Sequence, residues 1–170
     1  MGRRSTKENK NIYQISREEA GLTREKAAEL MEYVSADRIE KIESEKTAPH
    51  PEEILAMGKA YKKPLLCNYY CSKGCPIGQE MVPEIEVKEL TQITLEMLAS
   101  LNSVEADKNR LIEITSDGVI TEDEYADFAA IQEKLEKISL TVDGLNLWLQ
   151  NRIAEGKIDA EKLKSYRHSL

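Results

Sequence analysis

Helix start and stop signals recur at short intervals in residues 11–66, and they limit this stretch to short helices. Gly21 ends a helix that begins near Asn11, because glycine readily takes the left-handed backbone that terminates helices. Thr23 and Ser35 are placed to cap two further helices, since a hydroxyl there accepts a hydrogen bond from a free backbone N–H. Three short helices are therefore predicted in the first part of this stretch.

Two prolines mark two more helix starts. Pro51 lies at a first helical position with Glu52 and Glu53 behind it, where acidic side chains favour the positive end of the helix dipole. Pro64 begins a short fifth helix. Apolar residues with helical spacing are expected to face inward: Ile12, Ile15, Ala27, Ala28, Met31, Ile39, Ile42, Ile54, Leu55, Met57 and Ala60. We predict an all-α N-terminal domain over residues 11–75.

Three segments of this domain carry a resemblance to a known family. They are residues 17–28 (REEAGLTREKAA), residues 34–43 (VSADRIEKIE) and residues 49–61. Their order of caps and apolar positions resembles the lambda-repressor-like (Xre-type) helix-turn-helix family of transcriptional regulators. The resemblance covers about a third of the chain. It implies a five-helix fold and binding to double-stranded DNA.

The resemblance also implies a DNA-binding surface, because in this family the third helix enters the major groove and the start of the second meets a phosphate. The positions that face the groove are Ser35, Ala36, Asp37, Arg38 and Lys41. The positions that meet the DNA backbone are Thr23, Arg24 and Lys46. Arg38 and Lys41 are the expected base readers, since both can donate to guanine O6 and N7. Family members often pair an arginine of the first helix with the glutamate ending the third, which implies a structural Arg17–Glu43 ion pair.

Two features of this surface depart from the family pattern. The family usually has a glycine in the turn between its second and third helices, whereas this chain has Glu32 and Tyr33. Asp37 and Glu40 also place carboxylates on the reading helix, and several acids in one groove repel phosphates. A helix-turn-helix that binds only protein is the alternative, because a fold does not by itself determine a function.

The charge of the chain is divided unevenly. The net charge is −7, but residues 1–66 carry thirteen Lys and Arg against twelve Asp and Glu, whereas residues 67–170 carry eleven against nineteen. The N-terminal part can therefore approach a phosphate backbone, and the acidity belongs to the rest. Residues 1–10 are expected to form a flexible basic arm that stays a solvated tail, with contact to phosphates or a minor groove as the alternative.

Several function classes find little support. There are two histidines, no glycine-rich phosphate loop and no nucleophile motif, so we expect no enzyme and no cofactor. No apolar run reaches the length of a membrane span, and the N-terminus has no apolar signal core. We therefore expect a cytoplasmic protein with reduced cysteines and no membrane partner.

The three cysteines lie close together in the sequence. Cys67 and Cys71 are four residues apart and share a helix face, and Cys75 follows Gly74, which ends that helix. With His50 as a fourth ligand they could hold zinc, and an iron–sulfur cluster or a thiol switch also fits three thiolates. Paired CxxC spacing is missing, however, so we expect no metal and cysteines that act as small buried apolar residues.

The C-terminal part is predicted to be a helical hairpin. Residues 76–83 form a linker, and residues 84–170 contain two long amphipathic helices and a short terminal helix. The chain is 41% hydrophobic but only 5% aromatic, which suits such an aliphatic helical protein. Seam residues of the first helix are Leu90, Ile93, Met97, Leu101, Val104, Leu111 and Ile114, and those of the second are Phe128, Ile131, Leu135, Ile138, Val142, Leu145 and Leu149. Leu98, Trp148 and Ile153 lie off this coiled-coil-like seam, which predicts a second buried surface, most simply a homodimer.

The turn between the two long helices resembles half of a calcium loop. Gly118 and Glu124 match the sixth and twelfth positions of an EF-hand, but Glu113 and Thr115 stand where aspartates are expected. The simpler interpretation is an inter-helix turn in which Thr121 caps the second helix and Glu124 completes a capping box.

Together these patterns predict a homodimeric, sequence-specific regulator of transcription. Two-fold pairing implies a palindromic operator with half-sites about one helical turn apart. The alternatives are a protein-interaction module that uses the scaffold without DNA, and a regulator that senses a metal or thiol chemistry.

Overall fold

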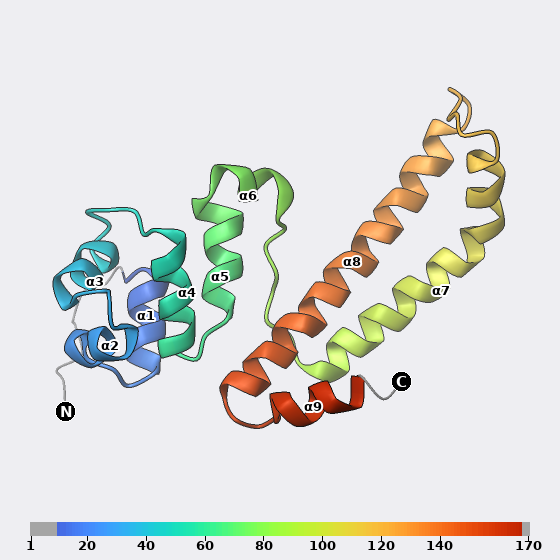
Figure 1. Ribbon diagram of the computed structural model, residues 1–170. Coiled ribbons are helices and arrows are strands. Elements are labelled where there is room, and N and C mark those ends of the chain that lie inside the picture. The colour runs from blue at the N-terminus through green and yellow to red at the C-terminus, as the bar shows by residue number, and fades with distance from the viewer. Residues whose placement is uncertain (1–9, 168–170) are drawn as a thin grey trace. The chain divides into compact units, whose positions relative to one another are not determined.

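The computed structural model describes residues 10–167, and within that range the chain forms helices and no strands (Figure 1). The elements are α1 (Ile12–Glu19), α2 (Arg24–Met31), α3 (Ala36–Glu43), α4 (Pro51–Ala60), α5 (Leu65–Tyr69), a π-helix η1 (Tyr70–Gly74), α6 (Pro76–Met81), α7 (Leu90–Thr115), α8 (Tyr125–Ala154) and α9 (Ala160–Arg167). The all-α fold class is confirmed. The predicted basic arm, apart from Lys10, lies outside the described residues.

The chain divides into two compact units. One runs up to Ile85 and includes the chain from Leu149 onward, and the other is Glu86–Trp148. We describe the helices before Ile85 and the α7–α8 hairpin separately.

Local capping chemistry sets the starts of the first three helices. The side chain of Asn11 accepts a hydrogen bond from the Gln14 N–H, and Thr23 and Ser35 do the same one turn into α2 and α3. The predicted caps at Thr23 and Ser35 are confirmed. In α4, Pro51 is at the first position, and the Glu53 carboxylate accepts from the His50 backbone N–H at 2.7 Å.

One apolar core joins the first five helices. Its buried members are Tyr13, Ala27, Met31, Val34, Ile39, Ile42, Ile54, Met57, Tyr61 and Leu66. Two residues predicted to face inward do not, since Ile15 is 41% exposed and Leu55 is 53% exposed. Helix α1 instead buries Gln14, Ser16 and Arg17; Gln14 donates to Glu18 one turn later, and Arg17 donates to Glu43 of α3. Apolar spacing alone therefore misplaced that face.

The corner between α2 and α3 holds an unusual backbone. Glu32 has φ 60° and ψ −48°, and the Tyr33 N–H donates to the Met31 carbonyl at 2.6 Å. This is a γ-turn with positive φ, which is rare and strained for a residue that has a Cβ. The Tyr33 hydroxyl donates to the Glu52 carbonyl at 2.7 Å and so fastens the corner to α4. Glu32 therefore takes the positive φ of this tight turn, at the place where the family that the chain resembles usually has a glycine.

Replacing this glutamate with glycine is expected to stabilise the domain. Glu32→Gly relieves the positive-φ strain and raises the free energy of unfolding by about 1 kcal/mol, which shifts Tm up by several degrees. The matched control is Glu29→Gly in the interior of α2, which lowers stability by about 1 kcal/mol because glycine weakens a helix. Thermal unfolding followed by circular dichroism measures both. A lower Tm for Glu32→Gly would show that the corner is not strained.

After α5 the chain folds back sharply through the π-helix and α6. A Cβ on Gly78 would lie 2.1 Å from the carbonyl oxygen of Cys71, so α6 approaches the π-helix as closely as only glycine allows. The Asn68 side chain makes two hydrogen bonds to the backbone of the segment after α6. It donates to the Pro83 carbonyl and accepts from the Ile85 N–H, both at 2.9 Å. These contacts hold the segment after α6 against α5.

The second unit is built on an antiparallel pair of long helices (Figure 1). Arg110 of α7 donates to Asp127 of α8 at 2.7 Å, and Lys134 pairs with Asp107. The seam buries Ile93, Ile114 and Ile131, which confirms these seam positions. Other predicted seam residues keep much of their surface in solvent, with exposures of 40% at Leu90, 47% at Leu101, 42% at Leu135 and 42% at Val142.

The hairpin turn differs from its prediction in one respect. Helix α8 begins at Tyr125 and not at Thr121, because residues 121–124 form a turn of their own. The Glu124 carboxylate accepts from the Thr121 N–H at 3.0 Å and from its hydroxyl at 2.7 Å. Gly118 takes φ 76°, as the end of a helix requires.

Candidate nucleic-acid interface

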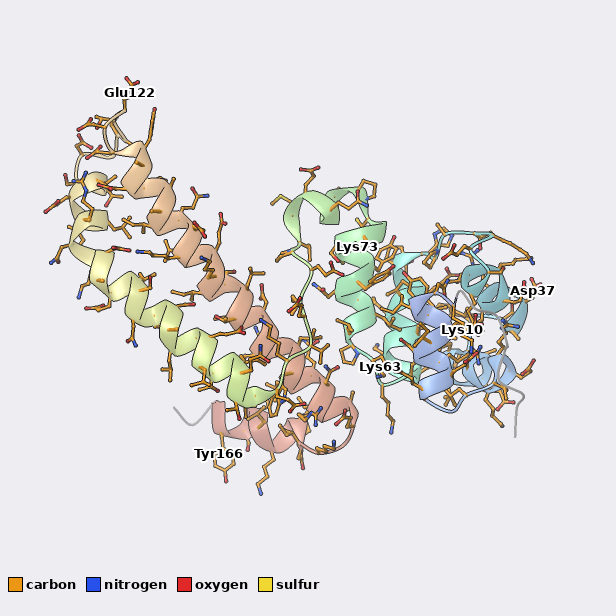
Figure 2. All side chains as sticks on the ribbon, turned by 180° about the vertical axis from the view of Figure 1, so that it is seen from behind. Lys10, Asp37, Lys63, Lys73, Glu122 and Tyr166 are labelled. Atoms are coloured by element: carbon orange, nitrogen blue, oxygen red, sulfur yellow. The ribbon has the colours of Figure 1, made fainter. Side chains whose placement is uncertain are left out.

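Helix α3 has one buried face and one open face. Ile39 and Ile42 are at most 1% exposed and fix the helix in the core. The opposite face carries charged residues, and Figure 2 shows Asp37 directed away from the domain. Ser35 caps this helix, and Ala36 is half-buried in its first turn.

A buried ion-pair network connects α1 and the start of α2 to the end of α3. The Glu43 carboxylate accepts from Arg17 Nε at 2.5 Å and from Arg17 Nη2 at 2.9 Å. Arg17 also donates to the Leu22 carbonyl at 2.6 Å. Burial is the largest single effect on the pKa of Arg17 and lowers it, but the hydrogen bond and the charge of Glu43, together with the charges of Tyr61 and Glu18, raise this pKa above its ordinary value. The Arg17–Glu43 pair implied by the family resemblance is confirmed.

Arg24 belongs to the same network. Its Nε donates to the second oxygen of Glu43 at 2.8 Å, and about a third of its side chain stays exposed. Sequence reasoning placed Arg24 only at the DNA backbone and missed this contact. The structure thus joins the start of α2 to the end of α3 through one carboxylate.

Arg38 is held on the protein by four hydrogen bonds. Its guanidinium donates to both Glu53 oxygens at 2.6 and 2.8 Å, to the Thr47 hydroxyl at 2.7 Å and to the Ala48 carbonyl at 2.9 Å. The hydrogen bond from Arg38 holds the pKa of Glu53 below its ordinary value. Arg38 therefore fixes residues 44–50 between α3 and α4, a role that no local sequence signal indicated.

The two remaining cations form exposed pairs. Lys41 bonds Asp37 one turn earlier at 2.7 Å, and Lys46 bonds Glu40 at 3.1 Å. The hydrogen bond from Lys46 lowers the pKa of Glu40. Exposed pairs of this kind contribute about 0–1 kcal/mol each, so a phosphate or a base edge can replace the carboxylate at little cost.

The predicted surface is thus brought together in space, but its charges are already paired within the domain. Thr23 serves as the cap of α2, accepting from the Lys26 N–H at 3.2 Å. Each of the four predicted cations, Arg24, Arg38, Lys41 and Lys46, contacts a carboxylate.

The cysteine segment contains no recognisable metal centre in the part of the chain described here. In residues 10–167 no three His, Cys, Asp or Glu side chains gather as metal ligands would. A Cβ on Gly58 would lie 3.4 Å from Cys67 Sγ, so Cys67 packs against α4, and burial raises the pKa of its thiol. His50 stands at the start of α4.

None of the helices in the described range is both long and apolar enough to cross a membrane.

The Helix-turn-helix family HTH_3 matches residues 15–66 of the chain. No match was found among curated proteins or among solved structures. The matched segment contains the capped α2 and α3, the Arg17–Glu43 pair and most of the buried core. Families of this kind are DNA-binding regulatory domains and not enzymes. Residues 15–66 of this chain are therefore a helix-turn-helix domain of the lambda-repressor (Xre-like) type.

Proposed function

We propose that this protein is a sequence-specific DNA-binding regulator of transcription that acts as a dimer. The observation that carries the proposal is the match of residues 15–66 to a DNA-binding family, in a domain whose α3 leaves one polar face open. In our proposal the domain of residues 11–75 binds DNA through Thr23, Arg24, Ser35, Ala36, Asp37, Arg38, Lys41 and Lys46. Residues 84–170 hold the dimer.

The paired cations decide how this surface would engage DNA. Lys41 and Lys46 can exchange a solvent-exposed carboxylate for a phosphate or a guanine edge at little cost. These two side chains are therefore expected to leave their carboxylates and contact DNA before Arg24 and Arg38 do. Arg38 must give up four hydrogen bonds to reach a base. Its main contribution is to hold residues 44–50, which carry Lys46, in one conformation. Asp37 can accept from cytosine N4 once Lys41 has left it.

The experiment is to select a binding sequence from random double-stranded DNA and to measure the affinity of the full chain for it. Lys41→Ala is expected to weaken binding about 5-fold to 150-fold if Lys41 reads a base. Lys59→Ala on the exposed side of α4 is the matched control and leaves affinity within about 2-fold. Equal effects of the two variants would contradict the assignment of α3 as the reading helix.

Arg38 variants separate positioning from base reading. Arg38→Ala lowers both affinity and Tm, because Glu53 loses its partner, whereas Lys41→Ala lowers affinity alone. Arg38→Lys keeps the charge but not the two-pronged contact with Glu53. Loss of Tm in Arg38→Lys with affinity retained would assign Arg38 to stability only.

The surface also supports a second candidate, a protein-interaction module. Asp37 is exposed, and each of the four predicted cations is neutralised within the domain. Failure to select any sequence at low salt favours that candidate.

A further inference from the structure

The α7–α8 hairpin presents a mostly apolar strip along one side. Its exposed members are Leu98 (53%), Leu101 (47%) and Ile112 (58%) on α7, and Leu135 (42%) and Val142 (42%) on α8. Phe128 lies half-buried in the same row of α8. We name these six residues the open face of the hairpin. Large exposed apolar strips of this kind on a single chain mark interaction surfaces.

The open face lies on one side of the hairpin for a geometric reason. Its α7 residues come one or four positions after the seam residues Met97, Val104 or Leu111. Its α8 residues come four positions after the seam residues Ile131 and Ile138, or three positions before Ile131, which is nearly the same rotation. Both helices are right-handed, so these steps turn in the same sense when each helix is viewed from its own start. Because the helices are antiparallel, both rows point to the same side of the plane that contains them.

Few charged side chains lie on the open face, as is typical of a surface that another protein covers. The α8 row, taken at steps of four and three residues, contains no charged side chain; it comprises Phe128, Gln132, Leu135, Ser139, Val142 and Asn146. The charged residues of α8 all occupy other positions. The α7 row contains two charges, Glu105 and Lys108, which pair with each other at 3.4 Å. Depletion of charge is typical of the centre of a protein interface, and 32% of this chain is charged.

The apolar residues of the α7 row and of the α8 row lie at corresponding heights along the hairpin axis. The Arg110–Asp127 and Lys134–Asp107 pairs set the register between the helices. In that register Ile112 lies at the height of Phe128, and Leu98 lies at the height of Val142. A two-fold axis parallel to the hairpin would lay α7 of one copy against α8 of another. Leu98 of one copy would then meet Val142 of the other, and Ile112 would meet Phe128.

We propose that the open face binds the open face of a second copy of this chain, with both hairpin turns at the same end of a four-helix bundle. The turn is the one that carries Glu122 (Figure 2). With 26 residues in α7 and two helices side by side, the face covers roughly 800 Å² per copy, which is the size of a standard stable interface. This arrangement also puts the two starts of α7 at one end, which is where the chain arrives from the helix-turn-helix domains. The pairing rests on the dimer of the proposed function and specifies its contact surface, whereas it does not depend on DNA binding.

Sedimentation of the full chain without DNA tests the pairing. The wild type sediments as a dimer at micromolar concentration, and Val142→Lys weakens the dimer at least about 100-fold, because the lysine would be buried without a partner. Leu140→Lys is the matched control, since Leu140 is 40% exposed but lies off the open face, and it stays dimeric. Circular dichroism confirms that both variants keep their helices. A monomeric wild type, or a dimer that survives Val142→Lys, overturns the proposal.

A mixing experiment tests the direction of pairing. Leu98→Glu and Val142→Lys each give a monomer alone, but their equimolar mixture forms a heterodimer, because the new glutamate faces the new lysine at the same height. If the two copies instead pair with their hairpin turns at opposite ends, residue 98 of one copy lies far from residue 142 of the other, and the mixture stays monomeric. DNA affinity is measured separately. A dimer that binds no DNA would therefore retain this proposal while rejecting the DNA binding of the proposed function.

Discussion

Glu43→Ala is expected to lower the free energy of unfolding of the helix-turn-helix domain by about 3–5 kcal/mol. Glu43 is 4% exposed and accepts hydrogen bonds from two arginines, and Arg17 beside it is 6% exposed. Removing the carboxylate leaves the Arg17 charge buried with only the Leu22 carbonyl as an acceptor among its described contacts. A charge without its counterion inside a protein destabilises far more than the pair itself stabilises.

Amide hydrogen exchange measures this effect where it occurs. Protection of the core amides of α1, α2 and α3 falls in proportion to the lost stability, while the α7–α8 amides serve as an internal control. The double variant Arg17→Met with Glu43→Ala should recover part of the loss, because it removes the unpaired charge. A loss under about 1 kcal/mol for Glu43→Ala, or no recovery in the double variant, would show that the pair is not buried as described.

Gly78→Ala is expected to lower stability by about 3 kcal/mol, the upper range for overpacking. The new Cβ would overlap the Cys71 carbonyl oxygen, and this neighbour is backbone and cannot rotate away. Helix α6 must therefore move off the π-helix. The hydrogen bonds that Asn68 makes to the segment after α6 are expected to weaken with it.

Gly144→Ala is the matched control for that change. Gly144 also lies inside a helix, but a Cβ there would meet nothing within 4 Å. Alanine at this position raises stability by about 0.5–1 kcal/mol through its better helix propensity. Thermal unfolding of the two variants should shift in opposite directions. A stabilised Gly78→Ala would mean that α6 does not pack as closely as the structure places it.

Local rules predicted the helices well because helix caps depend on neighbouring residues. Thr23 and Ser35 cap their helices through backbone groups three residues away, so the sequence contains the whole interaction. The Arg17–Glu43 contact spans 26 residues and was predicted through family resemblance alone.

Contacts between distant residues explain most of what the sequence did not predict. The Arg38–Glu53 and Arg24–Glu43 pairs depend on how α2, α3 and α4 pack, and no spacing rule connects their members. Ile15 has the spacing of a core residue but is 41% exposed, because the inner face of α1 is formed by Tyr13, Gln14, Ser16 and Arg17. The close approach at Gly78 likewise follows from the π-helix, which composition does not reveal.

The most direct test of the central claim, that this helix-turn-helix domain binds DNA through α3, is a salt titration on a selected double-stranded sequence. If the cations of α2, of α3 and of residues 44–50 exchange their carboxylates for phosphates, the logarithm of the affinity falls linearly with the logarithm of the salt concentration. Lys46→Ala should make that slope shallower by about one. The account predicts both results for the full chain. An affinity that does not change between about 50 and 200 mM salt, or a slope that Lys46→Ala leaves unchanged, would contradict it.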